Sequence, residues 1–176
     1  MDKSADVVVI GGGVIGGCVG YYLSMAGMKV CILERESIGS GATAHGHGSL
    51  STVGQDFDIG PHYLLGLASL RIYPEITSDI FEYTGTDPFF HEQPGISLAL
   101  IEEEENIFKR AMELQKKYVD MRWIGAREVQ ELEPRISEKA LGAVLYSHSQ
   151  VDAYRFTTGL VQAIEKRGGS VLLREA

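Results

Sequence analysis

A glycine-rich turn between two short apolar segments constrains the fold of this chain more than any other feature. Residues 7–35 read VVVIGGGVIGGCVGYYLSMAGMKVCILER. The run from Val7 to Ile10 is continuous and β-branched, which is typical of a strand buried on both faces. A helix pattern follows over residues 14–26 and a second strand pattern over residues 29–33. Strand, helix and strand within about thirty residues predict a βαβ unit with a parallel strand pair and a right-handed crossover.

The glycines of this turn have the spacing of a dinucleotide-binding site. Gly11, Gly13 and Gly16 form the pattern GxGxxG. In this pattern the first glycine permits a tight turn, the second lets the backbone approach a pyrophosphate, and the third lets the helix pack close to the sheet. The phosphates then lie at the helix N-terminus, near free N–H groups and the positive end of the helix dipole. An ordinary glycine-rich turn is the alternative, but the strands and the helix around the motif disfavour it.

The residues after the second strand bear on the choice of dinucleotide. Glu34 ends this strand, and a carboxylate there can accept hydrogen bonds from both hydroxyls of an adenosine ribose and would repel the 2′-phosphate of NADP. The motif alone does not separate FAD from NAD. Small residues that suit a loop crossing a pyrophosphate and following a flat ring come next, and they are Ser40, Gly41, Ala42 and Thr43. A surface loop without a ligand is the alternative for this segment.

Composition limits the partners and the compartment. The net charge of −8 argues against a nucleic-acid surface, because phosphate binding needs clustered Lys and Arg. Cys18 and Cys31 lie in apolar stretches without CxxC spacing, which favours buried thiols and a reducing compartment. No secretory signal is visible and no apolar stretch approaches the length of a membrane span. We therefore expect a cytoplasmic protein, with peripheral association at the inner membrane as an alternative.

The remaining sequence alternates further helix and strand patterns after an extended loop over residues 37–60. The helix patterns cover residues 62–83, 102–118, 127–132 and 153–167, and the strand patterns cover residues 95–101, 143–146 and 171–173. Pro74 is expected to kink or interrupt the first of these helices, because proline lacks an N–H and crowds the carbonyl four residues earlier. Asp152 is the expected N-cap of the last helix.

Beyond the glycine motif, the chain resembles the D-amino-acid oxidase superfamily of FAD-dependent oxidoreductases. Three segments follow the family order, namely GISLALIEEEENIFKRAMELQKKY, REVQELEPRIS and LGAVLYSHSQVDAYRFTTGLVQAIEKRGGSVL. That order is a strand entering the substrate domain, a helix, an E-x-E-P turn, a second strand, and V-D before a helix that ends in glycine. The chain is most similar to the branch of glycine oxidase, sarcosine and dimethylglycine oxidoreductases, and D-amino-acid or opine dehydrogenases. The resemblance covers nearly the whole chain.

This resemblance implies an α/β fold in which a Rossmann-like βαβ FAD-binding domain is joined to part of a second, α+β substrate domain. The FAD-binding domain would comprise residues 1–84 and 149–176 and would be incomplete. The first part of the substrate domain would comprise residues 85–148. Members of the family are more than twice as long as this chain, so we expect an N-terminal fragment, or one half of a protein completed by another chain.

The resemblance also implies which residues bind FAD. Those at the pyrophosphate turn are Gly11, Gly13, Val14, Ile15 and Gly16. Those at the adenosine ribose and in the loop over the phosphates are Glu34, Arg35, Ser40, Gly41, Ala42 and Thr43. Those along the flavin ring are His45, Gly46, His47, Gly48 and Ser49. No side chain of this chain is assigned as a catalytic acid or base.

The histidines allow further interpretations. The segment from Ser40 to His45 has the S-G-x-T-x-H arrangement in which a histidine of dimethylglycine-type relatives carries the flavin, whereas other branches hold FAD without a covalent bond. A histidine packed beside the flavin or a phosphate is the simpler alternative. His45, His47 and His62 find no further ligand at a convincing spacing, so we expect no metal site.

The implied activity is oxidation of the C–N bond of an amino acid or secondary amine, with the α-hydrogen passing as hydride to flavin N5 and the imine product hydrolysing. The implied partners are the amine substrate and an electron acceptor, either oxygen or a carrier, together with self-association or a partner subunit. We expect the chain alone to be inactive, because in this family the carboxylate clamp that orients the substrate lies beyond this length. Two alternatives stay open: a nucleotide-binding module or assembly subunit without catalysis, and an NAD-dependent dehydrogenase.

Overall fold

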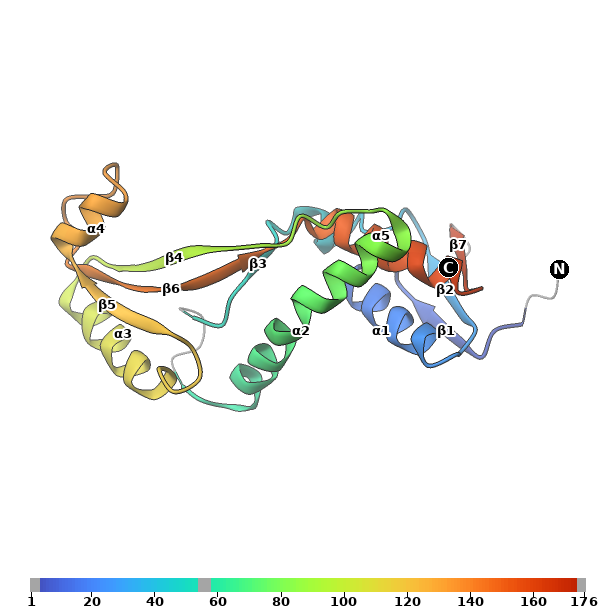
Figure 1. The fold of residues 1–176 in the computed structure, drawn as a ribbon, viewed down its shortest axis with the longest axis horizontal. Coiled ribbons are helices and arrows are strands. Elements are labelled where there is room, and N and C mark those ends of the chain that lie inside the picture. The colour runs from blue at the N-terminus through green and yellow to red at the C-terminus, as the bar shows by residue number, and fades with distance from the viewer. Residues whose placement is uncertain (1–3, 54–57, 174–176) are drawn as a thin grey trace. The chain divides into compact units, whose positions relative to one another are not determined.

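The computed structural model describes residues 4–53 and 58–173. Its elements in chain order are β1 (Val7–Ile10), α1 (Val14–Met25), β2 (Val30–Glu34), the 3-10 helix η1 (Ala42–His45), β3 (Ser49–Leu50), α2 (Pro61–Thr84), β4 (His91–Ala99), α3 (Glu102–Gln115), β5 (Met121–Gly125), α4 (Ala126–Leu132), β6 (Gly142–Gln150), α5 (Ala153–Lys166) and β7 (Ser170–Leu173) (Figure 1).

The chain divides into two compact units. The first unit comprises Met1–Ser49, Tyr73–Phe90 and Gln150–Ala176, and the second comprises Leu50–Ile72 and His91–Ser149. Helix α2 contributes its first half to the second unit and its second half to the first. The predicted assignment of a cofactor domain and a substrate domain to parts of the chain stays a prediction.

The first unit contains the βαβ arrangement that the glycine-rich segment predicts. Its three strands form a parallel sheet in the order β1-β2-β7. Val7 lies opposite Val30, and Leu33 lies opposite Ile10 on one side and Leu172 on the other. Helix α1 connects the first two strands, so the predicted parallel pair is present.

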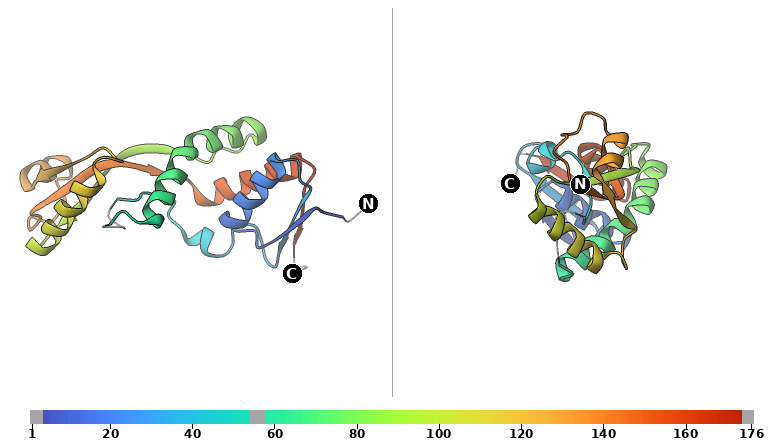
Figure 2. Two further views of the ribbon diagram at one scale, coloured as in Figure 1. Left: turned by 90° about the horizontal axis from the view of Figure 1, so that it is seen from below. Right: turned by 90° about the vertical axis from the view of Figure 1, so that its left-hand side faces the viewer.

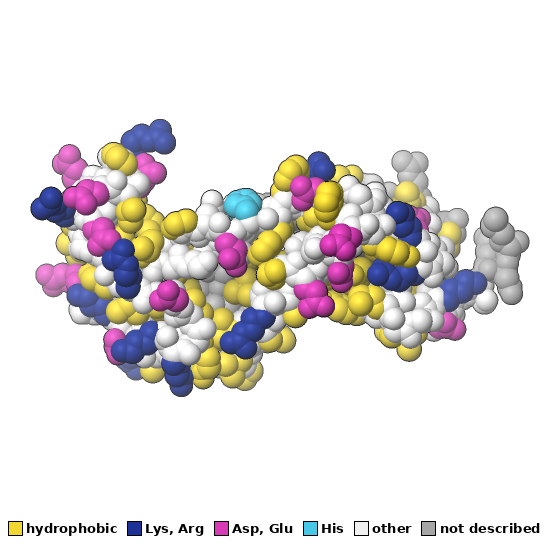
Figure 3. Space-filling model, viewed as in Figure 1, with side chains coloured by type: hydrophobic (Ala, Val, Ile, Leu, Met, Phe, Trp, Pro, Cys, Tyr) yellow, Lys and Arg dark blue, Asp and Glu magenta, His cyan; other side chains and the backbone are white. Residues whose placement is uncertain are grey.

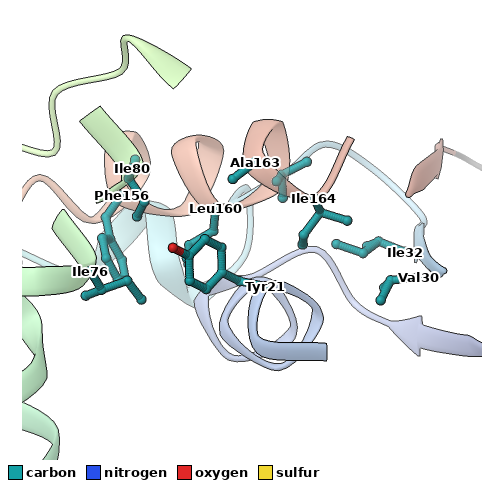
Figure 4. Close-up of a cluster of buried hydrophobic side chains, with 10 residues drawn as sticks. Tyr21, Val30, Ile32, Ile76, Ile80, Phe156, Leu160, Ala163 and Ile164 are labelled. Carbon is teal, nitrogen blue, oxygen red and sulfur yellow. The ribbon is translucent and has the colours of Figure 1, made fainter. Parts of the chain in front are cut away.

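Helices α1 and α5 pack against each other over this sheet, side by side in the views of Figures 1 and 2. Leu160 and Ile164 of α5 are fully buried and lie close to Tyr21 of α1 and Ile32 of β2 (Figure 4). Gly20 permits the close approach, since a Cβ there would lie 2.9 Å from Cδ1 of Ile164. The core therefore fixes the position of α1, and with it the glycine turn at its N-terminus.

The second unit is built on an antiparallel strand pair with helices α3 and α4. Its sheet runs in the order β3-β6-β4, and β5 pairs with β6 from Met121 opposite Tyr146 to Gly125 opposite Gly142. Ile124 and Val129 are almost completely buried in its core. Strand β5 was not predicted, and β4 and β6 are longer than their sequence patterns indicated.

Helix α2 is assigned as one helix that contains Pro74, so the chain is not interrupted there, and the kink that was the other expectation stays a prediction. A proline inside a helix costs about 3 kcal/mol, through one lost hydrogen bond and a steric conflict. Burial offsets this cost on both sides of the proline. Tyr63 and Leu67 are buried before it, and Ile76 and Ile80 are buried after it. The packing of both halves therefore outweighs the local preference.

Apolar side chains remain at the surface of the first unit. Ile10 of β1 is 81% exposed and Ile15 of α1 is 79% exposed. Figure 3 shows apolar side chains among acidic and basic ones on the visible face.

In the part of the chain that the structure describes, no helix combines the length and the apolar character that crossing a bilayer requires.

Candidate functional site

The turn between β1 and α1 has a backbone that only glycine suits. Gly11 has a φ of 104°, a positive backbone angle that residues other than glycine rarely adopt. Its N–H donates to the carbonyl oxygen of Leu33 at 2.8 Å, which joins the turn to β2. A Cβ on Gly16 would lie 2.0 Å from the carbonyl oxygen of Gly11. Helix α1 can therefore begin against the turn only because residue 16 has no side chain.

The backbone at Gly13 is open to a ligand. Among the described residues, and apart from the chain neighbours of Gly13 and nearby helix backbone, a Cβ built on Gly13 has one atom within 4 Å, Oγ1 of Thr43 at 3.3 Å. Gly13 is the N-cap residue of α1 and, as a glycine, gives the helix no side-chain cap. The first helical turn holds no acidic residue. The first N–H groups of a helix have no partner within the helix. An open backbone beside such donors fits a diphosphate, so the residues present satisfy this requirement for FAD.

Glu34, at the end of β2, is held against the turn as a charged group. Its Oε2 accepts a hydrogen bond from the N–H of Gly12 at 2.7 Å, and its Oε1 accepts one from the N–H of Glu36 at 2.8 Å. Both bonds lower the pKa of the Glu34 carboxyl, and the bond from the N–H of Glu36 has the larger effect. A carboxylate has about four acceptor positions, so the ionised group can still accept hydrogen bonds from ribose hydroxyls.

Gly12 is a structural part of the site that the sequence analysis did not single out. A Cβ there would lie 2.5 Å from Cδ1 of Ile38 and 3.2 Å from the Glu34 side chain. Glycine at position 12 therefore lets the carboxylate reach the backbone of the turn. The signal in the sequence was the run of three consecutive glycines, in which Gly12 lies between the two that the motif names.

The loop after β2 returns to the start of α1 through η1. Oγ1 of Thr43 accepts a hydrogen bond from the N–H of Val14 at 3.1 Å. Within the loop, the N–H of Ala44 donates to Gly41 and that of Gly46 donates to Thr43. Thr43 thus lies beside the glycine turn, and its role toward FAD stays a prediction.

Other predicted site residues lie in the strand end and loop around η1. Arg35 is exposed and forms an ion pair with Glu36, with Nε and Oε1 3.6 Å apart. Ser40 donates its N–H to the carbonyl oxygen of Ser37. Ala42 and His45 are exposed on η1. Within residues 4–53 and 58–173, no hydrogen bond or ion pair joins their side chains to the turn, and their roles toward FAD stay predictions.

The segment from Gly46 to Ser49 is tied to the residues that precede α5. Gly48 has a φ of 72°, and its carbonyl oxygen accepts a hydrogen bond from the N–H of Val151 at 3.0 Å. The side-chain amide of Gln150 donates to the carbonyl oxygen of His47 at 3.1 Å. These bonds give the segment a defined course.

Among residues 4–53 and 58–173, no three His, Cys, Asp or Glu side chains are grouped as metal ligands.

The second unit has an open groove of about 410 Å³ along the first residues of β4 and β5 and the middle of β6. Glu92, Asp120 and Arg122 are among its lining residues. Arg122 forms an ion pair with Glu128. No residue of this groove belongs to the predicted cofactor site, and its geometry assigns no acid or base to a reaction.

Comparisons with known proteins agree with this geometry. The model of a family described as FAD dependent oxidoreductase matches residues 6–176. Over 171 residues the chain is 31% identical to glycine oxidase of Geobacillus kaustophilus, covering 96% of this chain and 45% of that protein. Over 175 residues it is 29% identical to the mitochondrial dimethylglycine dehydrogenase of Rattus norvegicus, covering 97% of this chain and 19% of that protein.

A solved structure gives the same result. The crystal structure of glycine oxidase from Geobacillus kaustophilus matches with a TM-score of 0.91 and 30% identity, covering 97% of this chain and 46% of that one. The predicted fold class and the predicted family resemblance are therefore confirmed. The chain spans about half of the length of the glycine oxidase and about a fifth of the length of the dehydrogenase.

Proposed function

Since the chain belongs to the FAD dependent oxidoreductase family, we propose that the protein containing it oxidises the C–N bond of an amino acid or secondary amine. FAD is the cofactor of this family. The relatives reported above are, by name, an oxidase of glycine and a dehydrogenase of dimethylglycine. Both names give an amine-bearing substrate, which supports this substrate class for the whole protein.

The observation that carries this proposal is the glycine turn with an ionised acid beside it. The open backbone at Gly13 and the N–H groups in the first turn of α1 after Val14, whose own N–H donates to Thr43, bind phosphate oxygens. Glu34, whose pKa is lowered, accepts hydrogen bonds from the adenosine ribose. When bound, FAD supplies the acceptor for the substrate hydride at its N5 atom. The segment from Gly46 to Ser49 follows the flavin ring.

The two units take different parts in this function. The first unit, which contains the glycine turn, holds the cofactor. The second unit belongs to the half of the protein that orients the substrate, and orientation supplies much of the rate enhancement in a reaction of this type. The electron acceptor is oxygen or a carrier. The family match disfavours the NAD-dependent alternative, and a nucleotide-binding role without catalysis remains the second candidate for the chain by itself.

The cofactor part of the proposal is tested by loading the purified chain with FAD and, separately, with NADH. After removal of free ligand by gel filtration, we expect the absorption bands of oxidised flavin to elute with the protein and NADH to elute apart from it. A protein that retains NADH and no flavin would contradict the proposal. The reaction is tested on the whole protein, by anaerobic bleaching of its flavin with glycine, sarcosine and D-amino acids.

A further inference from the structure

We propose that Arg155 is a positioning residue for the reaction, which holds the turn where the chain leaves the first unit for β4 and thereby controls how fast the substrate reduces the flavin. This inference rests on the proposed function and adds to it a residue outside the predicted FAD site. The residue that Arg155 holds is Phe89, whose ring centroid lies 4.5 Å from the guanidinium carbon. Both residues belong to the first unit.

The two residues before α5 join segments at which the chain passes between the units. Among these passages are residues 49–50, 90–91 and 149–150. The N–H of Val151 donates to the carbonyl oxygen of Gly48 at 3.0 Å. The N–H of Asp152 donates to the carbonyl oxygen of Pro88 at 2.8 Å. Within the first unit, the chain ahead of β3, the chain ahead of β4 and the chain after β6 are therefore joined at one place.

The turn before β4 contains a strained residue. Among residues 4–53 and 58–173, Phe89 is the one residue other than glycine with a positive φ, 51°, which is rare for a bulky side chain and costs free energy. Its N–H donates to Oδ1 of Asp87 at 2.8 Å. Nε of Arg155 donates to the carbonyl oxygen of Asp87 at 2.8 Å, and its guanidinium covers the Phe89 ring. Arg155 therefore stabilises both ends of a turn that the backbone alone disfavours.

The residue after this turn is fixed by a different contact. The ring of Phe90 stacks on that of Tyr73 in α2, with centroids 6.5 Å apart and planes at 11°. The Tyr73 ring in turn lies 5.4 Å from that of Phe156, which is buried in α5. Strand β4 begins with the next residue. Since consecutive rings contact Arg155 and Tyr73, the start of β4 is held by two helices of the first unit.

The position of β4 matters for the reaction because the second unit, in the proposed function, orients the substrate. A misplacement of about 1 Å can cost on the order of 100-fold in rate. The glycine turn that binds the phosphates belongs to other elements, β1 and α1. Loss of the Arg155 contacts should therefore slow the reduction of the flavin and leave its binding unchanged.

The test compares variants of the whole protein. Arg155→Met keeps an unbranched side chain and removes the donor and the charge, while the N-cap of α5 is retained because Asp152 accepts from the backbone N–H of residue 155. Phe89→Ala removes a ring without opening the core, since Phe89 is 53% exposed. Arg127→Met is the matched control, because it removes an arginine whose side chain is 93% exposed and pairs with Glu131.

Three properties are measured for each variant. The first is the limiting rate at which glycine, sarcosine or a D-amino acid bleaches the flavin without oxygen. The second is the affinity of the apoprotein for FAD, by fluorescence titration. The third is hydrogen exchange of the Asp152 amide, which reports directly on the bond to the turn.

We expect Arg155→Met and Phe89→Ala to lower the limiting rate by on the order of 10- to 100-fold, with FAD affinity within about threefold of the unmodified protein. The Asp152 amide should lose protection in Arg155→Met, and Arg127→Met should change none of the three properties. An unchanged rate in both variants, or a loss of FAD affinity as large as the loss of rate, would overturn the inference. If no amine bleaches the unmodified protein, the proposed function fails, and equal protection of the Asp152 amide would still overturn the role of Arg155.

Discussion

Replacing Gly16 with alanine tests how closely α1 must approach the glycine turn. The new Cβ would lie 2.0 Å from the carbonyl oxygen of Gly11 and 3.2 Å from Cγ1 of Val9. Ordinary carbon–oxygen contacts are about 3.3–3.6 Å, so the helix or the turn must move by more than about 1 Å. The oxygen belongs to the backbone of Gly11, and the new Cβ is bonded directly to the backbone of residue 16. No side-chain rotation can therefore separate the two atoms.

Two opposing contributions determine the size of the effect. Overpacking costs about 1–3 kcal/mol, and we take the upper end because backbone has to shift. Alanine in place of glycine favours the helix by about 1 kcal/mol. The expected net loss in the free energy of unfolding is therefore about 2 kcal/mol. Since the first N–H groups of α1 are displaced, FAD binding should weaken by about tenfold or more.

Gly17→Ala is the control, one residue further along the same helix. Its Cβ would lie 3.4 Å from Cδ1 of Leu160, an ordinary contact. We expect this variant to be unchanged or stabilised by up to about 1 kcal/mol. Urea unfolding and flavin fluorescence titration measure both properties. Equal stability and equal FAD affinity of Gly16→Ala and Gly17→Ala would refute the argument that residue 16 sets the distance between helix and turn.

Three further predictions follow from the site. Glu34→Gln should weaken FAD binding by on the order of tenfold in a fluorescence titration, because one of the two N–H groups at this side chain then faces an amide nitrogen. Because the pKa of the Glu34 carboxyl is lowered from 4.5, its stabilising contribution is present above this pH and lost as the pH falls through the folded-state pKa. The difference in urea midpoint between Glu34→Gln and the unmodified chain should therefore narrow in acid. Acid precipitation of the FAD-loaded chain should leave the flavin in the supernatant, whereas a yellow pellet that His45→Ala abolishes would show a covalent link. The FAD-loaded chain, which spans 45% of the glycine oxidase, should not be bleached anaerobically by glycine, sarcosine or amino acids, and bleaching would contradict this.

The sequence predicts the first unit well because its signals are local. The β-branched run before Gly11, the glycine spacing and the acid at residue 34 each mark one step of the βαβ unit, and the structure places them in one sheet and one turn. Asp152 is also an N-cap, with its side chain accepting from the N–H of Arg155. A pattern that repeats within a few residues is enough for such predictions.

The second unit was harder to predict because its strands depend on partners far along the chain. Strand β5 reads MRWIG, is only five residues long, and has the exposed Arg122 between its apolar residues, so no continuous apolar run marks it as a strand. The last residues of β6 read SHSQ, from Ser147 to Gln150, and are polar throughout. Pairing between strands, rather than an apolar pattern, makes both segments extended.

Two features of the site also depend on three-dimensional contacts. The bond between Thr43 and the N–H of Val14 joins residues 29 positions apart. The space that Gly12 leaves for Glu34 and Ile38 depends on how β2 and the following loop return to the turn. Neither follows from residue spacing, although the residue types involved were visible in the sequence.

The most direct test of the cofactor site is FAD binding by Gly13→Val. Gly13 has a φ of −80° and an extended ψ, a conformation that valine adopts without strain. Among the described residues, chain neighbours aside, a Cβ there comes within 4 Å of Oγ1 of Thr43 alone, at 3.3 Å, a tight contact that a small shift of the Thr43 side chain relieves, so the variant should unfold close to the urea concentration of the unmodified chain. Its branched side chain would fill the space that the phosphates need, and we predict that it no longer retains flavin after gel filtration. A folded Gly13→Val protein that remains yellow would show that the phosphates of FAD do not bind at this turn.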